Sequence, residues 1–468
     1  MRNIGDNILV PPLNLFLIIG GSAYAFVVLF GLLYFIASTS SKKRVLPRTP
    51  IEDDYEEPFV SIIVPTYNEE KNIANCLQTL KNLEYENYEI ILSDGGSSDK
   101  TVAIAKNMID NIVIDETLPE GWIGKNWGCH VGYKQAKGEY LLFVDADTKH
   151  SPFSLQHFMK IALERDTALL TVFPFQRIKR WWESINPIFY FASYLTYGGN
   201  NSINDPRKKN SHSASGQFML FKRKDYEAIG GHESLKGNIV EDLALARRVK
   251  IKLGRLFFID GSKLISTRMY PESPSQCWEG WKKCLFPGTK LTQPRRITGA
   301  LMWFLWAMLA PVGIILSVLY APQWYFILIT SILYVFNLVA VFLYWNRKGT
   351  HQWVTYVFLP IVVVMFCILL AVSALELLIK KKTTWRGREY KPDLFTGSLY
   401  VDNGDIVDEN NQLDQLETDI ELELNGTVSK RKVELDRVPK IDPLLAKDCE
   451  KTKEPVPLTK MLQSNTSD

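Results

Sequence analysis

The sequence predicts an α/β protein with a doubly wound, mostly parallel sheet and with membrane helices before and after it along the chain. Three observations support this prediction. Short apolar strands alternate with helix-like segments, uncharged apolar stretches flank a large central block, and polar residues follow the predicted strands. The averages alone, 46% hydrophobic and 22% charged residues with a net charge of +3, would suggest an ordinary soluble protein.

The central block contains the strand and helix pattern. Strands are predicted at residues 59–64, 88–92 and 140–144, and helices near 69–83, 99–108 and 124–137. In parallel sheets of this kind, ligands bind beyond the carboxyl ends of the strands. Polar residues follow all three predicted strands, namely Asn68, Glu69, Asp94, Asp145 and Asp147.

Asp145 and Asp147 are the most informative of these residues. Spaced by two at a strand end, their carboxylates can both leave the sheet toward one site. Hard oxygen ligands of this kind suit Mg²⁺ or Mn²⁺, with water or phosphate oxygens at the other positions. A single strand-end aspartate such as Asp94 is as often a turn or helix cap.

Four apolar stretches are long enough to cross a bilayer. Residues 15–37 carry no charge, and further stretches cover 300–320, 324–345 and 352–379. About 20 helical residues cross the hydrocarbon core. We expect residues 1–37 to be a retained anchor, because the cations follow this apolar run, whereas in a cleaved signal peptide they precede it.

Basic residues beside these stretches predict their orientation. They follow the first stretch and precede the second, at Lys42, Lys43, Arg44, Arg48, Lys290, Arg295 and Arg296. Residues 38–299 are therefore expected on the cytoplasmic side of a multi-pass cell-membrane protein. One conflict follows, since Lys380, Lys381 and Lys382 would lie outside if 352–379 crossed fully. Either that stretch folds back or another segment does not cross.

The charge balance divides the chain further. Residues 38–299 are expected to be one catalytic domain and 300–382 the C-terminal membrane segments. Residues 383–468 hold 12 Lys and Arg against 18 Asp and Glu, which predicts a polar, largely disordered tail. The positive excess elsewhere flanks the apolar stretches and does not indicate nucleic-acid binding. The six cysteines show neither metal spacing nor a disulfide framework, which suits a reducing compartment.

Four segments together resemble one enzyme family. VSIIVPTYNEE (60–70), DGGSSDKT (94–101), LLFVDADT (141–148) and VEDLALARR (240–248) resemble the inverting family 2 glycosyltransferases of GT-A fold. The finer pattern in 118–132, 230–250 and 268–283 is similar to the membrane-bound carotenoid glycosyltransferases of diaponeurosporenoate and hydroxychlorobactene type. The resemblance implies transfer of a sugar, usually from a UDP-sugar, to a lipid acceptor.

The same resemblance implies roles for individual residues. The nucleotide sugar would be bound by Pro65, Tyr67, Glu69, Asp94, Lys125 and Asp145. The divalent cation would be held by Asp145 and Asp147. Asp242 would be the catalytic base that takes the proton of the acceptor hydroxyl, or that orients an acceptor carboxylate. The acceptor side would include Gly216, Gln217, His232, Glu241, Trp278 and Trp281.

Plainer interpretations stay open for several of these residues. Lys125 could be a solvated surface lysine, and His232 only a turn residue. Acids in the first turn of a helix, such as Glu241, are favoured by the helix dipole. Trp278 and Trp281 lie on a predicted helix over 273–287 that could face either the membrane interface or the core.

Other functions also remain possible. Within the enzyme class the alternatives are a ceramide-type glycolipid synthase and a polyprenyl-phosphate glycosyltransferase. Processive polymerisation is not expected, because Gly280 stands where the polysaccharide synthases of this family carry an arginine. A catalytically silent, nucleotide-binding membrane scaffold would be marked by loss of a metal or base carboxylate, and Asp145, Asp147 and Asp242 are all present.

Overall fold

The structure is a computed structural model. It describes residues 55–320 apart from 198 and 293, 324–350, 353–385 and 388–390, together with the shorter segments 26–37 (without 28 and 32), 49–51, 399–402 and 405–408. The expected anchor in residues 1–37 and the expected disordered tail in 383–468 therefore lie largely outside the described residues.

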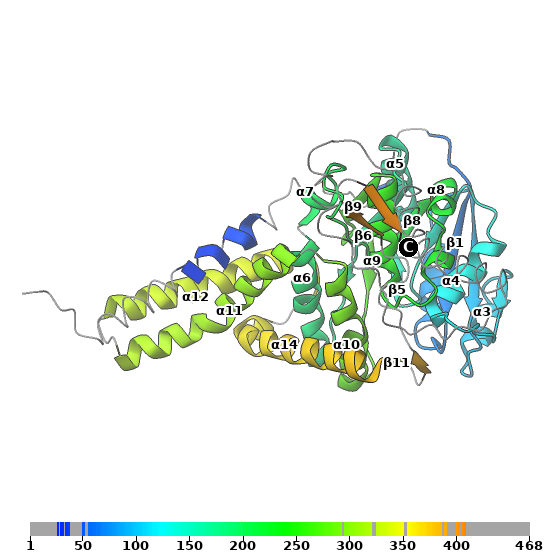
Figure 1. The fold of residues 1–468 in the computed structure, drawn as a ribbon. Helices are drawn as coiled ribbons and strands as arrows, with labels where there is room; N and C mark the ends of the chain where they lie inside the picture. Colours follow the sequence, from blue (N-terminus) through cyan, green and yellow to red (C-terminus); the bar gives the residue numbers. More distant parts are fainter. Residues whose placement is uncertain are drawn as a thin grey trace, which may run out of the picture. The chain divides into compact units, whose positions relative to one another are not determined.

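A seven-stranded sheet in the order β3-β2-β1-β4-β8-β6-β9 forms the centre of the α/β domain. Figure 1 labels its strands β1, β6, β8 and β9. Its strands are β1 (Val60–Thr66), β2 (Tyr88–Asp94), β3 (Ile112–Ile114), β4 (Tyr140–Phe143), β6 (Leu169–Phe173), β8 (Met219–Lys222) and β9 (Leu256–Asp260). β8 runs antiparallel to its neighbours β4 and β6, and the other pairings are parallel. The predicted α/β class with a mostly parallel sheet is confirmed.

Helices cover both faces of this sheet, as expected for a doubly wound arrangement. They are α2 (Ile73–Lys81), α3 (Thr101–Lys106), α4 (Gly124–Gln135), α5 (Ser154–Glu164), α6 (Asn186–Tyr197), α7 (Gly199–Ile203), α8 (Arg223–Ala228) and α9 (Glu241–Lys252). Short 3₁₀ turns span Trp181–Ile185 and His232–Leu235. The three predicted helices are present, each shorter than its apolar pattern suggested.

A second, three-stranded sheet borders the first at the strand ends. It consists of β5 (Thr148–His150), β10 (Ile265–Thr267) and β7 (Phe175–Gln176), in the order β5-β10-β7. β5 begins directly after Asp147, and β10 leads into the segment 268–273. This small sheet therefore fixes two chain segments beside the carboxyl ends of the central strands.

Alternating burial along β1 divides the core into two layers. Ile62 and Val64 belong to the cluster that includes Leu77 of α2, whereas Ile63 belongs to the cluster that includes Cys129 of α4. All five side chains are at most 1% exposed. Because successive strand residues point to opposite faces, one short apolar run supplies both layers.

The C-terminal part of the described chain, from residue 274 onward, is built from long helices and short hairpins. The helices are α10 (Pro274–Lys290), α11 (Pro294–Tyr320), α12 (Trp324–Trp345), α13 (Trp353–Val357) and α14 (Leu359–Leu375), and α14 continues into a π turn over Glu376–Lys380. The hairpin strands are β11 (Thr383–Trp385), β12 (Arg388–Tyr390), β13 (Leu399–Asp402) and β14 (Asp405–Asp408). Within the described residues, three helical stretches are long and apolar enough to cross a membrane: Arg296–Ile315, Ile327–Trp345 and Leu359–Lys380.

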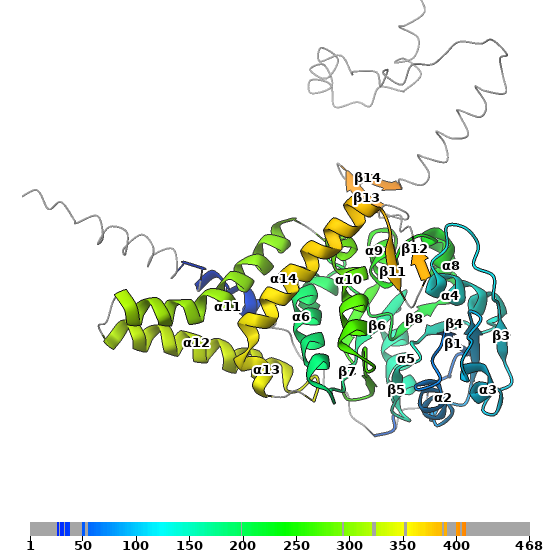
Figure 2. The ribbon, with the colours of Figure 1, turned by 90° about the horizontal axis from the view of Figure 1, so that it is seen from below.

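The apolar stretch predicted at 352–379 is not one continuous helix. It is divided into α13 and α14, and Pro360 lies in the first turn of α14. Proline is tolerated there because the first helical residues have no intrahelical acceptor for their N–H groups. Figure 2 shows α14 beside α10 and α6, while α11 and α12 run alongside each other.

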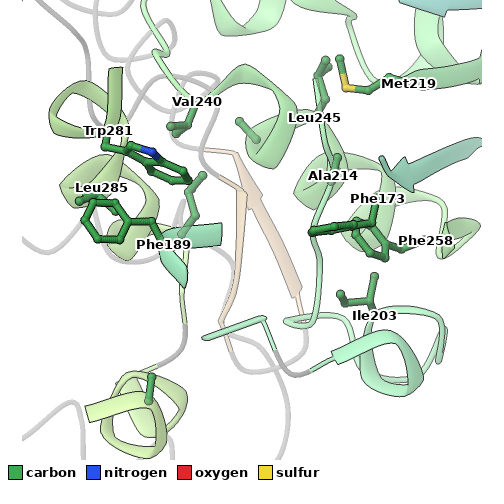
Figure 3. Packing of buried hydrophobic residues seen from close by; sticks show 14 of the residues in the cluster. Phe173, Phe189, Ile203, Ala214, Met219, Val240, Leu245, Phe258, Trp281 and Leu285 are labelled. Atoms are coloured by element: carbon green, nitrogen blue, oxygen red, sulfur yellow. The ribbon is translucent and has the colours of Figure 1, made fainter. Parts of the chain in front are cut away.

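One apolar cluster joins the catalytic domain to these helices. Figure 3 shows Trp281 and Leu285 of α10 close to Phe189 of α6. Phe189 also packs edge-on against Phe366 of α14, with ring centroids 5.1 Å apart. The catalytic domain and the apolar helices therefore share a continuous core.

The described part of the first apolar stretch is helical and packs on α11. Tyr34 donates a hydrogen bond to the carbonyl of Arg296 over 3.3 Å. Its ring lies where a side chain at Gly299 would stand, since an added Cβ there would be 2.3 Å from the ring. Small residues permit such close approach between apolar helices.

Candidate active site

A cavity of about 750 Å³ lies at the carboxyl ends of β1, β2 and β4. This is the position at which open α/β sheets bind ligands. Eight of the predicted site residues line it, namely Pro65, Tyr67, Glu69, Lys125, Asp145, Asp147, Gln217 and Glu241. The fold therefore brings together residues that are up to 176 positions apart in the sequence, from Pro65 to Glu241.

Lys125 forms ion pairs with two carboxylates of this cavity. Its Nζ lies 2.7 Å from Asp145 Oδ1 and 3.0 Å from Glu241 Oε1. Burial would lower the pKa of Lys125, but Asp145 and then Glu241 hold it well above its usual value. Burial would likewise raise the pKa of Glu241, and the Lys125 charge holds it below its usual value instead. Lys125 and Glu241 are therefore both charged at neutral pH.

The buried carboxylate of Asp147 is suited to binding a cation. Among the described residues its Oδ1 is buried without a hydrogen-bond partner. Burial, followed by the charge of Asp145, raises the pKa of Asp147 to about 7. A divalent cation would supply the missing partner and would favour the ionised form.

The described residues supply two carboxylates to such a cation and no larger ligand group. A search of them for clusters of three or more His, Cys, Asp or Glu finds none. Mg²⁺ and Mn²⁺ tolerate this, because they commonly keep waters and take phosphate oxygens of the substrate as further ligands. The residues present thus fit a cation that is completed by a bound diphosphate.

Asp242 lies next to this group at the start of α9. Its Oδ2 accepts a hydrogen bond from the N–H of Gly216 over 3.0 Å, and its Oδ1 accepts one from Leu243 over 2.8 Å. Burial, followed by the charge of Glu241, raises the pKa of Asp242 to about 6. A carboxylate with a pKa just below neutral is well placed to accept a proton.

Gly216 permits this cluster to assemble. A Cβ at Gly216 would lie 2.7 Å from Lys125 Nζ and 3.6 Å from Asp242 Oδ2. Any larger residue would push the lysine out of its position between the two carboxylates. Gly216 therefore affects the site by leaving room for Lys125, although its own atoms do not line the cavity.

Asp94 is the last residue of β2, and its predicted contact with the nucleotide stays a prediction. It is 1% exposed and does not line the cavity. Its carboxylate accepts hydrogen bonds from Thr66 Oγ1, the N–H groups of Gly96 and Ser97, and Ser97 Oγ, over 2.6–3.1 Å. These bonds hold the turn after β2, so Asp94 shapes the cavity edge and is not itself a lining residue.

The predicted acceptor-side residues divide into two groups. Gln217 and Glu241 line the cavity, whereas His232, Trp278 and Trp281 do not. His232 is fully buried, its Nδ1 lies 2.8 Å from the hydroxyl of Tyr226, and burial lowers its pKa to about 3.

The two tryptophans of α10 face different environments. Trp281 is 5% exposed and donates from Nε1 to Asn186 Oδ1 over 2.7 Å. Trp281 therefore faces the core, which is one of the two orientations considered for this helix from the sequence. Trp278, about one turn earlier on α10, is 37% exposed.

Several lining residues were not among the predicted ones. The segment after β10 and the start of α10 contribute Met269, Tyr270, Pro271, Glu272, Ser273, Ser275, Gln276 and Glu279. Strand β12 contributes Arg388 and Tyr390. The sequence signal for β12 was the polar run TTWRGREY after the last apolar stretch, whose arginines could serve phosphate if that segment lay on the catalytic side.

The fold and this site define an enzyme class. A strand-end cavity with a carboxylate pair suited to a cation, a paired lysine and an aspartate of raised pKa fits group transfer from an anionic, phosphate-bearing ligand.

The comparison with protein families gives the particular class. Residues 61–230 match the family model described as Glycosyl transferase family 2. These residues are similar to a family 2 glycosyltransferase domain, and the match supports the glycosyltransferase class for this enzyme.

Curated relatives cover more of the chain. The 4,4'-diaponeurosporenoate glycosyltransferase of Staphylococcus aureus strain USA300 is 29% identical over 273 residues, which is 57% of this chain and 71% of the relative. The protein of the same name from strain MRSA252 is 26% identical over 343 residues, which is 72% of this chain and 89% of the relative. The predicted resemblance is thereby confirmed.

Solved structures of glycosyltransferases also resemble the chain. A mannosyltransferase from Pyrobaculum calidifontis, in complex with GDP-Man and Mn2+, is 17% identical with a TM-score of 0.47, and the match covers 79% of this chain and 99% of that one. Glucosyl-3-phosphoglycerate synthase from Mycobacterium tuberculosis, in complex with Mn2+, UDP and product, is 17% identical with a TM-score of 0.32 over 46% of this chain and 73% of that one.

Proposed function

We propose that the protein transfers a sugar from a nucleotide-sugar donor to a membrane lipid, with inversion at the anomeric carbon. The observation that carries this proposal is that Asp145, Asp147 and Lys125 line one cavity, with Asp242 beside them at the start of α9. The glycosyltransferase class of the chain supports it, and so does the name of its curated relatives for the acceptor.

Asp242 acts as the base in this proposal. The acceptor oxygen attacks the anomeric carbon from the face opposite the diphosphate, and the bond from that carbon to the phosphate oxygen breaks as the new carbon–oxygen bond forms. The proton of an acceptor hydroxyl passes to Asp242. An acceptor carboxylate arrives without that proton, and Asp242 then only orients it.

Asp145 and Asp147 would hold the divalent cation, Mg²⁺ or Mn²⁺. When bound, that cation neutralises the charge that develops on the departing diphosphate. Lys125 compensates the charges of Asp145 and Glu241, so that an anionic donor can enter an otherwise acidic site. Tyr67, Pro65 and Glu69 form the wall on the β1 side, where the nucleoside would lie.

The lipid acceptor is supported by the apolar helices and by their contact with the catalytic domain. α11, α12 and α14 are apolar enough to enter a membrane, and the core cluster connects them to the site-bearing domain. A carotenoid or related isoprenoid acceptor follows the name of the relatives. Ceramide and polyprenyl phosphate are the alternative acceptors, since nothing in the described cavity discriminates among them.

One experiment tests donor and acceptor together. The purified protein is incubated with labelled UDP- and GDP-sugars, Mn²⁺ and a total lipid extract, and the products are analysed by mass spectrometry. We expect one sugar added to a lipid, with inverted anomeric configuration. A labelled product without lipid would refute the acceptor class, and binding of the nucleotide without any turnover would favour the catalytically silent scaffold.

A further inference from the structure

Strand β12 carries a cation into the donor end of the cavity from far along the chain. The Arg388 guanidinium stacks on the ring of Tyr67 at 3.9 Å, and its Nη2 donates to the carbonyl of Gly95 over 3.2 Å. Tyr67 and Gly95 follow β1 and β2, so Arg388 joins the edge at which the nucleoside would lie. Tyr390, on the same strand, reaches Gly124 at the start of α4.

The contacts of Arg388 distinguish it from Lys71 and Lys125, which line the same cavity. Lys71 is paired with Glu272 over 2.8 Å, and Lys125 is paired with two carboxylates. The contacts of Arg388 are with an aromatic ring, a carbonyl and the hydroxyl of Tyr390, and none of them is with a carboxylate of the described residues. Its charge therefore remains available to an anionic ligand.

We propose that Arg388 binds the nucleoside diphosphate of the donor, and that α14, which precedes it, begins and ends on the catalytic side of the membrane. The inference rests on the proposed function, because it assigns a further contact to the donor site. Arginine is suited to both parts of such a ligand, since its planar guanidinium stacks on rings and donates paired hydrogen bonds to phosphate.

The short connection between α14 and Arg388 requires that the end of α14 lie on the catalytic side of the membrane. Lys380, where the π turn ends, and Arg388 are eight positions apart in the sequence. Fully extended they span at most about 28 Å, which is less than the roughly 30 Å hydrocarbon core alone. The β11–β12 hairpin shortens the reach further. Lys380 therefore lies on the same side as the cavity.

The start of α14 is fixed to the same side. The Thr350 hydroxyl accepts a hydrogen bond from the N–H of Ile178 over 2.7 Å and donates one to its carbonyl over 3.1 Å. Thr350 and Leu359, the first residue of α14, are nine positions apart, and five of the residues between them form α13, so the connection is far shorter than an extended chain. With both ends at the catalytic domain, α14 makes no net crossing.

Contacts along α14 agree with this placement. Glu376 pairs with Lys282 of α10 over 2.7 Å, and the hydroxyl of Ser373 donates to the Lys282 carbonyl over 2.5 Å and accepts from the N–H of Phe286 over 3.2 Å. α14 is thus bound along α10, beside the catalytic domain. The conflict over Lys380, Lys381 and Lys382 disappears, because all three lie on the cytoplasmic side if the catalytic domain does.

Nucleotide binding to the full-length protein tests the role of Arg388. UDP and GDP are each titrated in the presence of Mn²⁺ into the wild type, Arg388→Ala, Arg388→Lys and the control Lys382→Ala, whose lysine pairs with Glu389 on the exposed side of the same hairpin. We expect Arg388→Ala to weaken binding of the preferred nucleotide by about ten- to a hundredfold, as for loss of a charged hydrogen bond. Arg388→Lys should lose less, and Lys382→Ala should match the wild type.

The outcomes separate this inference from the function on which it rests. If the wild type binds neither UDP nor GDP, the proposed function fails and the inference with it. If the wild type binds and Arg388→Ala binds equally well, only the inference fails. An equal loss in Lys382→Ala would show that the hairpin acts by folding alone, which also overturns it.

Labelling in sealed vesicles tests the placement of α14. A cysteine at Lys380 and a reference cysteine at the exposed Lys137 of the catalytic domain are each treated with a membrane-impermeant maleimide, with the wild type as background. We expect both cysteines to be labelled in the same vesicle population. Labelling of Lys380→Cys from the side opposite Lys137→Cys would refute the placement.

Discussion

Replacing Asp242 with asparagine tests the identity of the base with little disturbance of shape. The carboxylate accepts hydrogen bonds from the N–H groups of Gly216 and Leu243 over 3.0 and 2.8 Å. An amide oxygen can keep the first of these bonds, but an amide cannot take up the acceptor proton. Loss of a positioned general base costs about 10²–10⁴-fold in rate, which corresponds to about 3–5 kcal/mol in activation free energy.

The pH dependence of the transfer rate is a second test of Asp242 as the base. Asp242 has a pKa raised to about 6 and acts when deprotonated. The rate of transfer to a hydroxyl acceptor should therefore fall as the pH falls through about 6, reaching roughly a tenth of its plateau near pH 5. Saturating Mn²⁺ keeps Asp147 ionised in this experiment. Asp242→Asn should lack this limb of the profile.

The assay measures transfer and UDP binding on the same preparations. Burial makes the ionised form of Asp242 destabilising, so any stability it contributes is present below about pH 4 and is lost as the pH rises through about 6. The unfolding temperature of Asp242→Asn at pH 7.5 should accordingly equal or exceed that of the wild type. If Asp242→Asn transferred sugar to a hydroxyl acceptor at the wild-type rate, the role of Asp242 as the base would be refuted. If the variant lost UDP binding or unfolded at a lower temperature than the wild type, the role of Asp242 would be structural.

Three further substitutions probe the surrounding interactions. Asp147→Asn should lower Mn²⁺-dependent transfer by at least about 10²-fold and remove its response to added Mn²⁺, and normal turnover would contradict the cation site. Lys125→Met should weaken UDP binding and lower the unfolding temperature by several degrees at pH 7.5. The loss should be smaller near pH 5, where Glu241 takes up a proton because burial raises its pKa once the lysine charge is gone; equal losses at both pH values would argue against the ion pairs. Lys282→Met should destabilise the protein by about 3 kcal/mol in thermal unfolding, because it leaves the Glu376 charge without its partner. The double variant Lys282→Met with Glu376→Met should recover most of this stability. A double variant as unstable as Lys282→Met would contradict the importance of the pair.

The central strands were predictable because their signal is local. An apolar run such as 59–64 requires burial on both faces, and the turn residues beyond it mark its end. The structure extends β1 by two residues to Thr66 and places Asp145 and Asp147 at the predicted edge. Residues that follow parallel strands converge there whatever the details of the loops.

Side-chain direction in irregular segments was not predictable in the same way. Asp94 ends strand β2 and His232 begins a 3₁₀ turn, and both form hydrogen bonds that no local pattern specifies. Trp278 and Trp281 lie three residues apart on one helix, yet only the packing of α10 against Asn186 and Phe189 decides which of them is buried.

The apolar stretch 352–379 shows most clearly what hydropathy alone does not predict. Hydropathy detects that residues 352–379 avoid water, but it does not distinguish a helix that crosses a membrane from one that packs along another helix. The ion pair between Lys282 and Glu376 joins residues 94 positions apart, and its formation depends on the tertiary arrangement of α10 and α14.

The sequence by itself determined the class of this protein. The α/β pattern, the family 2 segments and the candidate residues Asp145, Asp147 and Asp242 all follow from short runs of residues, whose chemistry is fixed by type and spacing. Only the tertiary structure decided that Lys125 lies between Asp145 and Glu241 and that Arg388 enters the same cavity. The physical reason is that such contacts depend on how distant segments pack, and packing is decided by the whole core.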